Sequence, residues 1–191
     1  MTWIKICGIT TPRDAEIAID LGASAIGLIF APSSREVSLE RARDIARSVR
    51  GRAELVGVFK EVFSVRAVHE AVGLDRMQIH VPGRPDVSLP ILRAIRPEEL
   101  ATWEDVPVEE TILIDGSEGR GLAFDWSLAR PISRPFVLAG GLSPTNVEEA
   151  IAEARPMGVD VTSGVESVPG RKDENKLALF FEAVRRADAR D

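Results

Sequence analysis

Eight short runs rich in apolar residues alternate with runs of helical apolar spacing, and this alternation limits the fold more than any other feature. Several of these runs are apolar at consecutive positions, as in parallel strands that are covered on both faces. Strands separated by helices build parallel sheets, and eight of them suggest a closed sheet. The sequence therefore predicts an α/β fold, a parallel eight-stranded (β/α)8 barrel of the TIM-barrel type. The eight runs are residues 3–8, 25–30, 54–60, 76–81, 91–96, 111–115, 136–141 and 158–164.

Helix starts and helical runs occur where this order requires them. Thr11-Pro12 and Ser143-Pro144 each offer a hydroxyl for the N-cap and a proline for the first helical position. Helical apolar spacing also marks residues 38–49, 64–72 and 173–187. In contrast, residues 82–90 and 126–130 are too short or too rich in proline for a full crossover helix. We therefore expect short or vestigial helices after the fourth and sixth strands.

Composition fits one domain over residues 1–191, because a chain of 191 residues with 45% hydrophobic content can bury one sizeable core. A net charge of −6 argues against nucleic acid or a membrane surface as a partner. The single cysteine excludes an internal disulfide, and no apolar run reaches the length of a membrane span. With no secretory pattern at the amino terminus, we expect a cytoplasmic protein. Two histidines and one cysteine give no convincing spacing for a metal site.

Cys7 is the first candidate catalytic residue, because it follows the first predicted strand at the rim where such barrels carry their reacting groups. Strand alternation places Trp3, Lys5 and Cys7 on one face, and the apolar Ile4 and Ile6 on the other should face the helices. An inward Lys5 would favour the thiolate and lower the pKa of Cys7, which would make it a base near neutral pH. The alternative is that Cys7 is a small buried filler of the core.

Asp125 is the second candidate, a possible general acid that follows the sixth strand and its glycine-containing loop. It is equally suited to cap the helical turn that begins at Trp126, since aspartate is a preferred N-cap residue. One carboxyl group can serve as both the general acid and the N-cap.

The ends of the seventh and eighth strands carry small residues whose backbone N–H groups can approach an anion closely. Gly140 and Gly141 follow one strand, and Ser163 and Gly164 follow the other. Barrels of this kind hold phosphate at these two turns, although a strand-to-helix bend also favours glycine. We therefore expect a small, phosphorylated substrate.

Three further side chains are candidates for substrate binding. Arg35, after the second strand, can offer a forked pair of donors to a carboxylate, but a solvated loop arginine is the simpler interpretation. His80 ends the fourth strand beside Gln78 and is expected to line the pocket, whereas His69 lies in a helical run and is expected at the surface.

Taken together, the segments from Lys5 to Lys176 resemble phosphoribosylanthranilate isomerase, the barrel enzyme of tryptophan biosynthesis. No single motif suffices, but their order is highly specific. The motifs are Lys5-Ile6-Cys7-Gly8-Ile9-Thr10, Gly22-Ala23, Gly27-Leu28-Ile29-Phe30, Ser34-Arg35, Val56-Gly57-Val58-Phe59, Gln78-Ile79-His80, Phe124-Asp125-Trp126, Leu138-Ala139-Gly140-Gly141-Leu142, residues 159–166, Pro169-Gly170 and Lys172-Asp173.

The resemblance implies an Amadori rearrangement of N-(5-phosphoribosyl)anthranilate to 1-(2-carboxyphenylamino)-1-deoxyribulose 5-phosphate, with neither metal nor organic cofactor. Cys7 matches the family's general base and Asp125 its general acid. Arg35 matches the position that holds the anthranilate carboxylate. Gly141, Ser163 and Gly164 match the phosphate-binding turns. Whether the protein is a monomer or a homodimer is left open.

Two positions depart from the family pattern. His80-Val81 replaces the usual His-Gly, and Glu118-Gly119-Arg120-Gly121 replaces the glycine-rich Gly-Gly-Ser-Gly of the sixth loop. The altered loop keeps a noncatalytic sugar-phosphate-binding barrel open as an alternative. The related histidine-pathway aminoaldose isomerase is a second alternative, but its pattern has an aspartate base where this chain has Cys7, and it needs a second phosphate site. A dual-substrate enzyme is disfavoured for the same reason.

Overall fold

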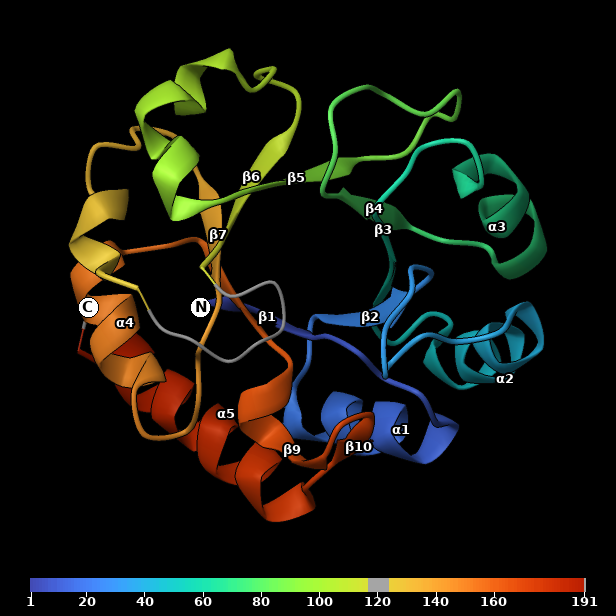
Figure 1. Cartoon of the computed structure of the whole chain (residues 1–191). Coiled ribbons are helices and arrows are strands. Elements are labelled where there is room, and N and C mark those ends of the chain that lie inside the picture. Colours follow the sequence, from blue (N-terminus) through green and yellow to red (C-terminus); the bar gives the residue numbers. More distant parts are fainter. Residues whose placement is uncertain (117–123, 191) are drawn as a thin grey trace.

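The computed structural model describes residues 1–116 and 124–190, and these residues form a closed barrel of eight parallel strands (Figure 1). Each strand pairs with the next one in the sequence, and the last pairs with the first, with Trp3 opposite Gly158. The predicted fold class is therefore confirmed. The strands are β1 (Trp3–Ile6), β2 (Ala25–Ile29), β3 (Glu54–Phe59), β4 (Arg76–Ile79), β5 (Ile91–Ile95), β6 (Thr111–Asp115), β7 (Phe136–Ala139) and β8 (Gly158–Val161).

Among the described residues, five α-helices lie outside the barrel, and the first begins at the cap that the sequence indicates. The Thr11 hydroxyl accepts a hydrogen bond of 3.1 Å from the Asp14 N–H, and Pro12 takes the first helical position. Ser38 and Asp173 cap their helices in the same way. No helix within the described ranges is long and apolar enough to cross a membrane. The helices are α1 (Pro12–Leu21), α2 (Leu39–Val49), α3 (Val65–Val72), α4 (Val147–Ala154) and α5 (Glu174–Asp188).

The start of α4 differs from the prediction. Ser143 and Pro144 begin a turn, and the helix starts only at Val147. The Asn146 side chain closes that turn, because its Oδ1 accepts the Ser143 N–H at 2.8 Å and its Nδ2 donates to the Gly141 carbonyl at 2.9 Å. The turn thus ties the helix entry to the loop that follows β7.

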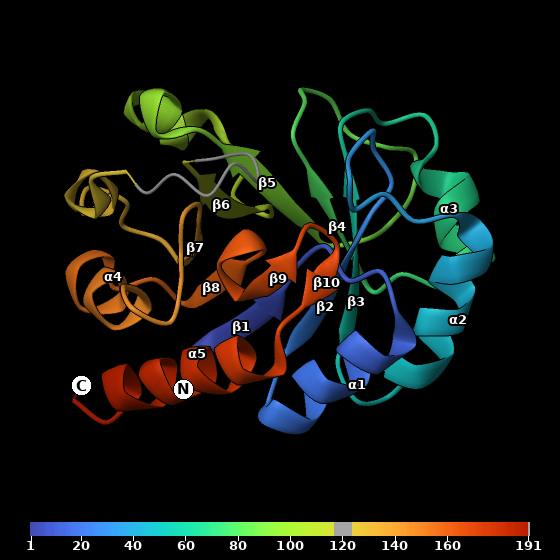
Figure 2. The same cartoon turned by 60° about the horizontal axis from the view of Figure 1, so that its bottom comes forward.

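In the part of the chain that the structure describes, one side of the barrel lacks regular crossover helices, as predicted for the connections after β4 and β6. Residues 80–90 hold only bends and irregular backbone (Figure 1), and β6 is followed by the four-residue 3-10 helix η2 (Trp126–Ala129). The connection after β5 also lacks a regular α-helix, which the sequence did not indicate. It holds η1 (Pro97–Asp105), a 3-10 helix broken at Thr102. A 3-10 helix η3 (Ser163–Val165) and a hairpin of β9 (Glu166–Val168) and β10 (Arg171–Lys172) separate β8 from α5 (Figure 2).

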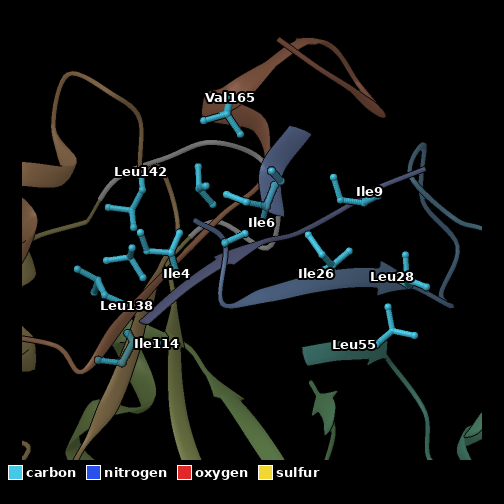
Figure 3. Close-up of a cluster of buried hydrophobic side chains, with 14 of the residues drawn as sticks. Ile4, Ile6, Ile9, Ile26, Leu28, Leu55, Ile114, Leu138, Leu142 and Val165 are labelled. Atoms are coloured by element: carbon cyan, nitrogen blue, oxygen red, sulfur yellow. The ribbon is translucent and has the colours of Figure 1, made fainter. Parts of the chain in front are cut away.

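Strand alternation divides the core into two layers. Ile4, Ile6 and Ile26 belong to the large cluster between the strands and the helices (Figure 3), as predicted for the two β1 residues. The inward side chains form a separate small cluster against which Trp3 packs: Ala25, Val56, Leu92, Leu113, Val137 and Ala139. Along β1, Lys5 and Cys7 follow Trp3 on this inward face, nearer the carboxyl ends of the strands.

Candidate active site

The Cys7 thiol lies inside the barrel at the carboxyl end of β1. The residue is 4% exposed, and its backbone N–H donates to the Val161 carbonyl of β8 at 2.9 Å. Gly27 on β2 leaves room for it, because a Cβ at Gly27 would meet Cys7 Sγ at 2.9 Å and Lys5 Cε at 3.0 Å. The inward direction predicted for Lys5 and Cys7 is thus confirmed, and the two side chains share one space.

Lys5 is the centre of a buried polar network that crosses the barrel. Its side chain is fully buried, and Nζ donates to Asp160 Oδ1 at 2.9 Å and to Gln78 Oε1 at 2.8 Å. The Gln78 amide nitrogen in turn lies 2.8 Å from His80 Nε2. The side chains on β8, β1 and β4 are therefore joined directly beside the thiol.

Burial determines the protonation of Cys7, and the expectation that Lys5 lowers the net pKa of this thiol is wrong. Burial raises the pKa of the Cys7 thiol, and the Lys5 charge lowers it by less than burial raises it, so the net shift is upward. Burial alone would lower the pKa of Lys5, but the charge of Asp160 and its hydrogen bond to Lys5 help to raise that pKa overall. Lys5 acts in the predicted direction, but the ligand-free protein holds a neutral thiol near neutral pH.

Alkylation of Cys7 can measure this balance, because the chain has no other cysteine. With a small haloacetamide, we expect the apparent pKa of the reaction to lie above the ordinary thiol value of about 8.5. Lys5→Met should raise it further, since the cation that favours the thiolate is gone. An unchanged apparent pKa in Lys5→Met would discard the coupling between the two groups.

The Lys5–Asp160 pair also makes a prediction for stability. Both side chains are almost completely buried, at 0% and 6% exposure, so Lys5→Met leaves an unpaired carboxylate inside the barrel. We expect the free energy of unfolding in urea to fall by about 3–5 kcal/mol. The double variant Lys5→Met/Asp160→Asn removes both charges and should recover most of that loss. If the double variant is as unstable as the single one, charge pairing is not the cause.

Arg35 is held by a carboxylate of the chain itself. Its Nε and Nη2 donate to Glu166 at 2.9 and 2.7 Å, and Gly8 permits the approach, since a Cβ there would meet Arg35 Cδ at 2.7 Å. Glu166 also accepts from Lys172 Nζ at 3.1 Å. Burial alone would raise the pKa of Glu166, but the bonds from Arg35 and Lys172 lower it overall. Arg35 is therefore a fixed, paired residue and not a solvated loop arginine.

The two glycine-containing turns meet at the barrel mouth. Gly140, Gly141 and Ser163 line one small cavity of about 20 Å³, together with the inward carboxylates Asp115 and Asp160. Gly164 packs on the loop after β7, because a Cβ there would lie 2.0 Å from the Leu142 carbonyl oxygen. The structure thus brings together the residues predicted for phosphate.

Asp125 caps η2 in this structure. Its Oδ1 accepts from the Ser127 N–H at 3.0 Å and from the Ser127 hydroxyl at 2.6 Å, and the residue is exposed. These two hydrogen bonds lower the pKa of Asp125, so the ligand-free protein carries a carboxylate here. The capping role is thus present. The sixth-loop residues Glu118 to Gly121 lie outside the described residues.

A larger cavity of about 480 Å³ opens on the side that lacks crossover helices. The inward residues His80 and Asp115 line it, as does Thr102 of η1. Because the loop after β4 replaces a helix there, the cavity extends from the barrel mouth over β5 toward η1. His80 lines a pocket as predicted, whereas Gln78 lies beneath it at 3% exposure.

Three buried charged residues of the site were not singled out from the sequence: Asp160, Glu166 and Lys172. For Asp160 a signal exists, because an aspartate inside an otherwise apolar strand requires a buried partner. For Glu166 and Lys172 there is none, since their pairing depends on the β9–β10 hairpin. No cluster of three or more metal-ligating side chains occurs among the described residues.

Comparison with known proteins assigns the chain to a family. The family model described as N-(5'-phosphoribosyl)anthranilate (PRA) isomerase matches residues 4–183. A PRA isomerase from Magnetococcus marinus is 41% identical over 200 residues, which cover 96% of this chain and 95% of the relative. The crystal structure of the Thermus thermophilus enzyme has a TM-score of 0.85 at 34% identity, covering 97% of this chain and 99% of that one.

A further solved relative is a PRA isomerase in complex with reduced 1-(o-carboxyphenylamino)-1-deoxyribulose 5-phosphate. It has a TM-score of 0.81 at 32% identity and covers 97% of this chain and 100% of that one. The similarity therefore extends over both the sequence and the fold of whole chains. The protein belongs to the N-(5'-phosphoribosyl)anthranilate isomerase family.

Proposed function

We propose that the protein converts N-(5'-phosphoribosyl)anthranilate into 1-(2-carboxyphenylamino)-1-deoxyribulose 5-phosphate by an acid/base Amadori rearrangement, without metal or organic cofactor. One observation carries the proposal: a chain that matches this family over residues 4–183 holds a buried thiol inside the barrel, beside Lys5, at the carboxyl end of β1. This is the rim at which such barrels act.

In the proposed mechanism, Asp125 protonates the ribose ring oxygen, and the C1–O bond breaks to give an open-chain Schiff base. Cys7 then removes the proton from C2, and the electron pair of that C–H bond forms the C1–C2 double bond of an enolamine. Protonation of C1 and loss of the C2 hydroxyl proton give the ketone. One acid and one base are sufficient, because no electrons enter or leave the substrate.

This mechanism needs the opposite protonation states from those of the free protein. The free protein favours a thiol at Cys7 and a carboxylate at Asp125, whereas the reaction starts from an acid and uses a thiolate. Bound substrate would shift the pKa of Cys7 downward and the pKa of Asp125 upward, as the mechanism requires. A cationic Schiff base beside Cys7 favours the thiolate, and exclusion of water around Asp125 favours the neutral acid.

The remaining site residues are proposed to hold the substrate. Gly140, Gly141, Ser163 and Gly164 would bind the phosphate through backbone N–H groups and the Ser163 hydroxyl. Arg35 would bind the anthranilate carboxylate. Its Nε and Nη2 edge is taken by Glu166, so the substrate would meet the outer Nη1 and Nη2 edge. Gln78 and His80 would complete the wall of the pocket.

Turnover tests the proposal. Purified protein given freshly prepared phosphoribosylanthranilate should quench the substrate's fluorescence as the product forms. The exposed, capping position of Asp125 favours one competing function, a sugar-phosphate-binding barrel without catalysis. Binding of substrate without fluorescence loss would support that competitor. Turnover of the histidine-pathway aminoaldose, without turnover of phosphoribosylanthranilate, would support the second alternative, the histidine-pathway aminoaldose isomerase.

A single partner class follows from this function, a small phosphorylated molecule. A cytoplasmic location, and a monomer or homodimer without nucleic acid or membrane, remain predictions. Size-exclusion chromatography with light scattering would measure the oligomeric state.

A further inference from the structure

Four polar side chains form an unbroken chain of contacts from β8 to the end of β4. Asp160 and Gln78 both accept from Lys5 Nζ, at 2.9 and 2.8 Å, and Gln78 Nε2 lies 2.8 Å from His80 Nε2. Gln78 is 3% exposed and Lys5 is fully buried, so bulk water does not compete for these groups. His80 is the one member of this chain that lines the 480 Å³ cavity.

The chemistry of each group fixes the direction of every hydrogen bond in this chain. An ammonium can only donate, so the Gln78 atom that faces Lys5 must be the carbonyl oxygen. The other end of the same amide is then the NH2 group, which donates. His80 Nε2, which faces that NH2 group, must therefore accept. A neutral imidazole that accepts at Nε2 carries its proton on Nδ1.

Lys5 sets the orientation of the Gln78 amide, because without the cation the two orientations of this amide differ little in energy. A flipped amide would present its oxygen to His80 and would select the tautomer with the proton on Nε2. The paired Asp160 carboxylate keeps Lys5 charged and therefore keeps the amide in the first orientation. A charge buried under the site thus determines which ring nitrogen of His80 is a donor.

We propose that Lys5 is a positioning residue for His80: its ammonium orients the Gln78 amide, and the amide holds the imidazole as the tautomer that carries its proton on Nδ1. The single ring donor of His80 is then its Nδ1–H. This inference deepens the proposed function, because His80 is one of the proposed substrate-binding residues. It does not depend on turnover, since it concerns the ligand-free protein.

The experiment is 15N NMR of histidine-labelled, ligand-free protein at pH 8.5, about two units above the ordinary imidazole pKa near 6.5. The chain has two histidines, so His69→Gln assigns the spectrum and His69 in the other samples is the internal control. In the wild type we expect roughly a tenfold excess of the Nδ1–H tautomer at His80, the effect of about one hydrogen bond.

Two variants separate the effect of the Gln78 amide from the effect of the Lys5–Asp160 pair. Gln78→Met keeps the Lys5–Asp160 pair and removes the amide, and Lys5→Met/Asp160→Asn removes both charges but keeps the amide. In each, the excess at His80 should fall to about twofold or less, while His69 stays unchanged. A wild-type His80 with its proton on Nε2 would overturn the inference. Retention of the full excess without Lys5 and Asp160 would show that the cation does not set the tautomer.

Discussion

Replacing Cys7 by serine should lower kcat by about 10²- to 10⁴-fold, the usual contribution of a general base. Serine keeps the size and the hydrogen-bonding capacity of the side chain, but its hydroxyl does not ionise near neutral pH. Oxygen is smaller than sulfur, so serine fits beside Gly27 without displacing β2. The measurement is kcat and KM from loss of substrate fluorescence.

The control for Cys7→Ser is unfolding in urea, where the variant should stay close to the wild type, because the substitution is small and introduces no charge. A structural filler would show the reverse pattern, with nearly full kcat. That result would remove Cys7 from the mechanism.

Asp125→Asn should lower kcat by about 10²- to 10⁴-fold as well, because an amide cannot donate the proton that opens the ribose ring. Asparagine is an N-cap as good as aspartate, so the hydrogen bond from the Ser127 N–H can persist. The substitution therefore separates the two roles of this residue. Activity should be lost while the free energy of unfolding changes by less than about 1 kcal/mol.

A matched variant strengthens this test. Ser127→Ala removes the hydroxyl that contacts Asp125 at 2.6 Å and should raise the pKa of the carboxyl group, because one of the two bonds that lower it is lost. It should leave kcat within about tenfold of the wild type, since the acid itself remains. Unchanged kcat in Asp125→Asn would mean that Asp125 only caps η2 and that another group supplies the proton.

The barrel was predictable because its signals are local. Apolar runs of strand length, and caps such as Thr11 before Pro12, are set by residues that are neighbours in the sequence. The start of α4 was placed wrongly because the same Ser-Pro pattern begins a turn there, and the turn depends on how Asn146 bonds back to Ser143 and Gly141. The break in η1 at Thr102 has no comparable local signal.

In the site, the direction in which side chains point was predictable from the sequence, whereas the net pKa shifts were not. Period-two alternation correctly placed Lys5 and Cys7 inside the barrel. The net pKa shift of Cys7 was predicted with the wrong sign, because the neighbouring cation is visible in the sequence whereas complete burial is not. Likewise, the sequence left Arg35 either as a donor to a substrate carboxylate or as a solvated loop arginine, and neither interpretation included Glu166, 131 positions away, which pairs with it.

Single-turnover kinetics would separate catalysis by Cys7 and Asp125 from substrate binding, because protein in excess over phosphoribosylanthranilate reports the chemical step without product release. The wild type should consume the fluorescent substrate completely, and Cys7→Ser and Asp125→Asn should each slow this one step by about 10²-fold or more. Substrate bound by the wild type with its fluorescence intact, or equal rates in all three proteins, would show that these two residues are not the base and the acid of an isomerase.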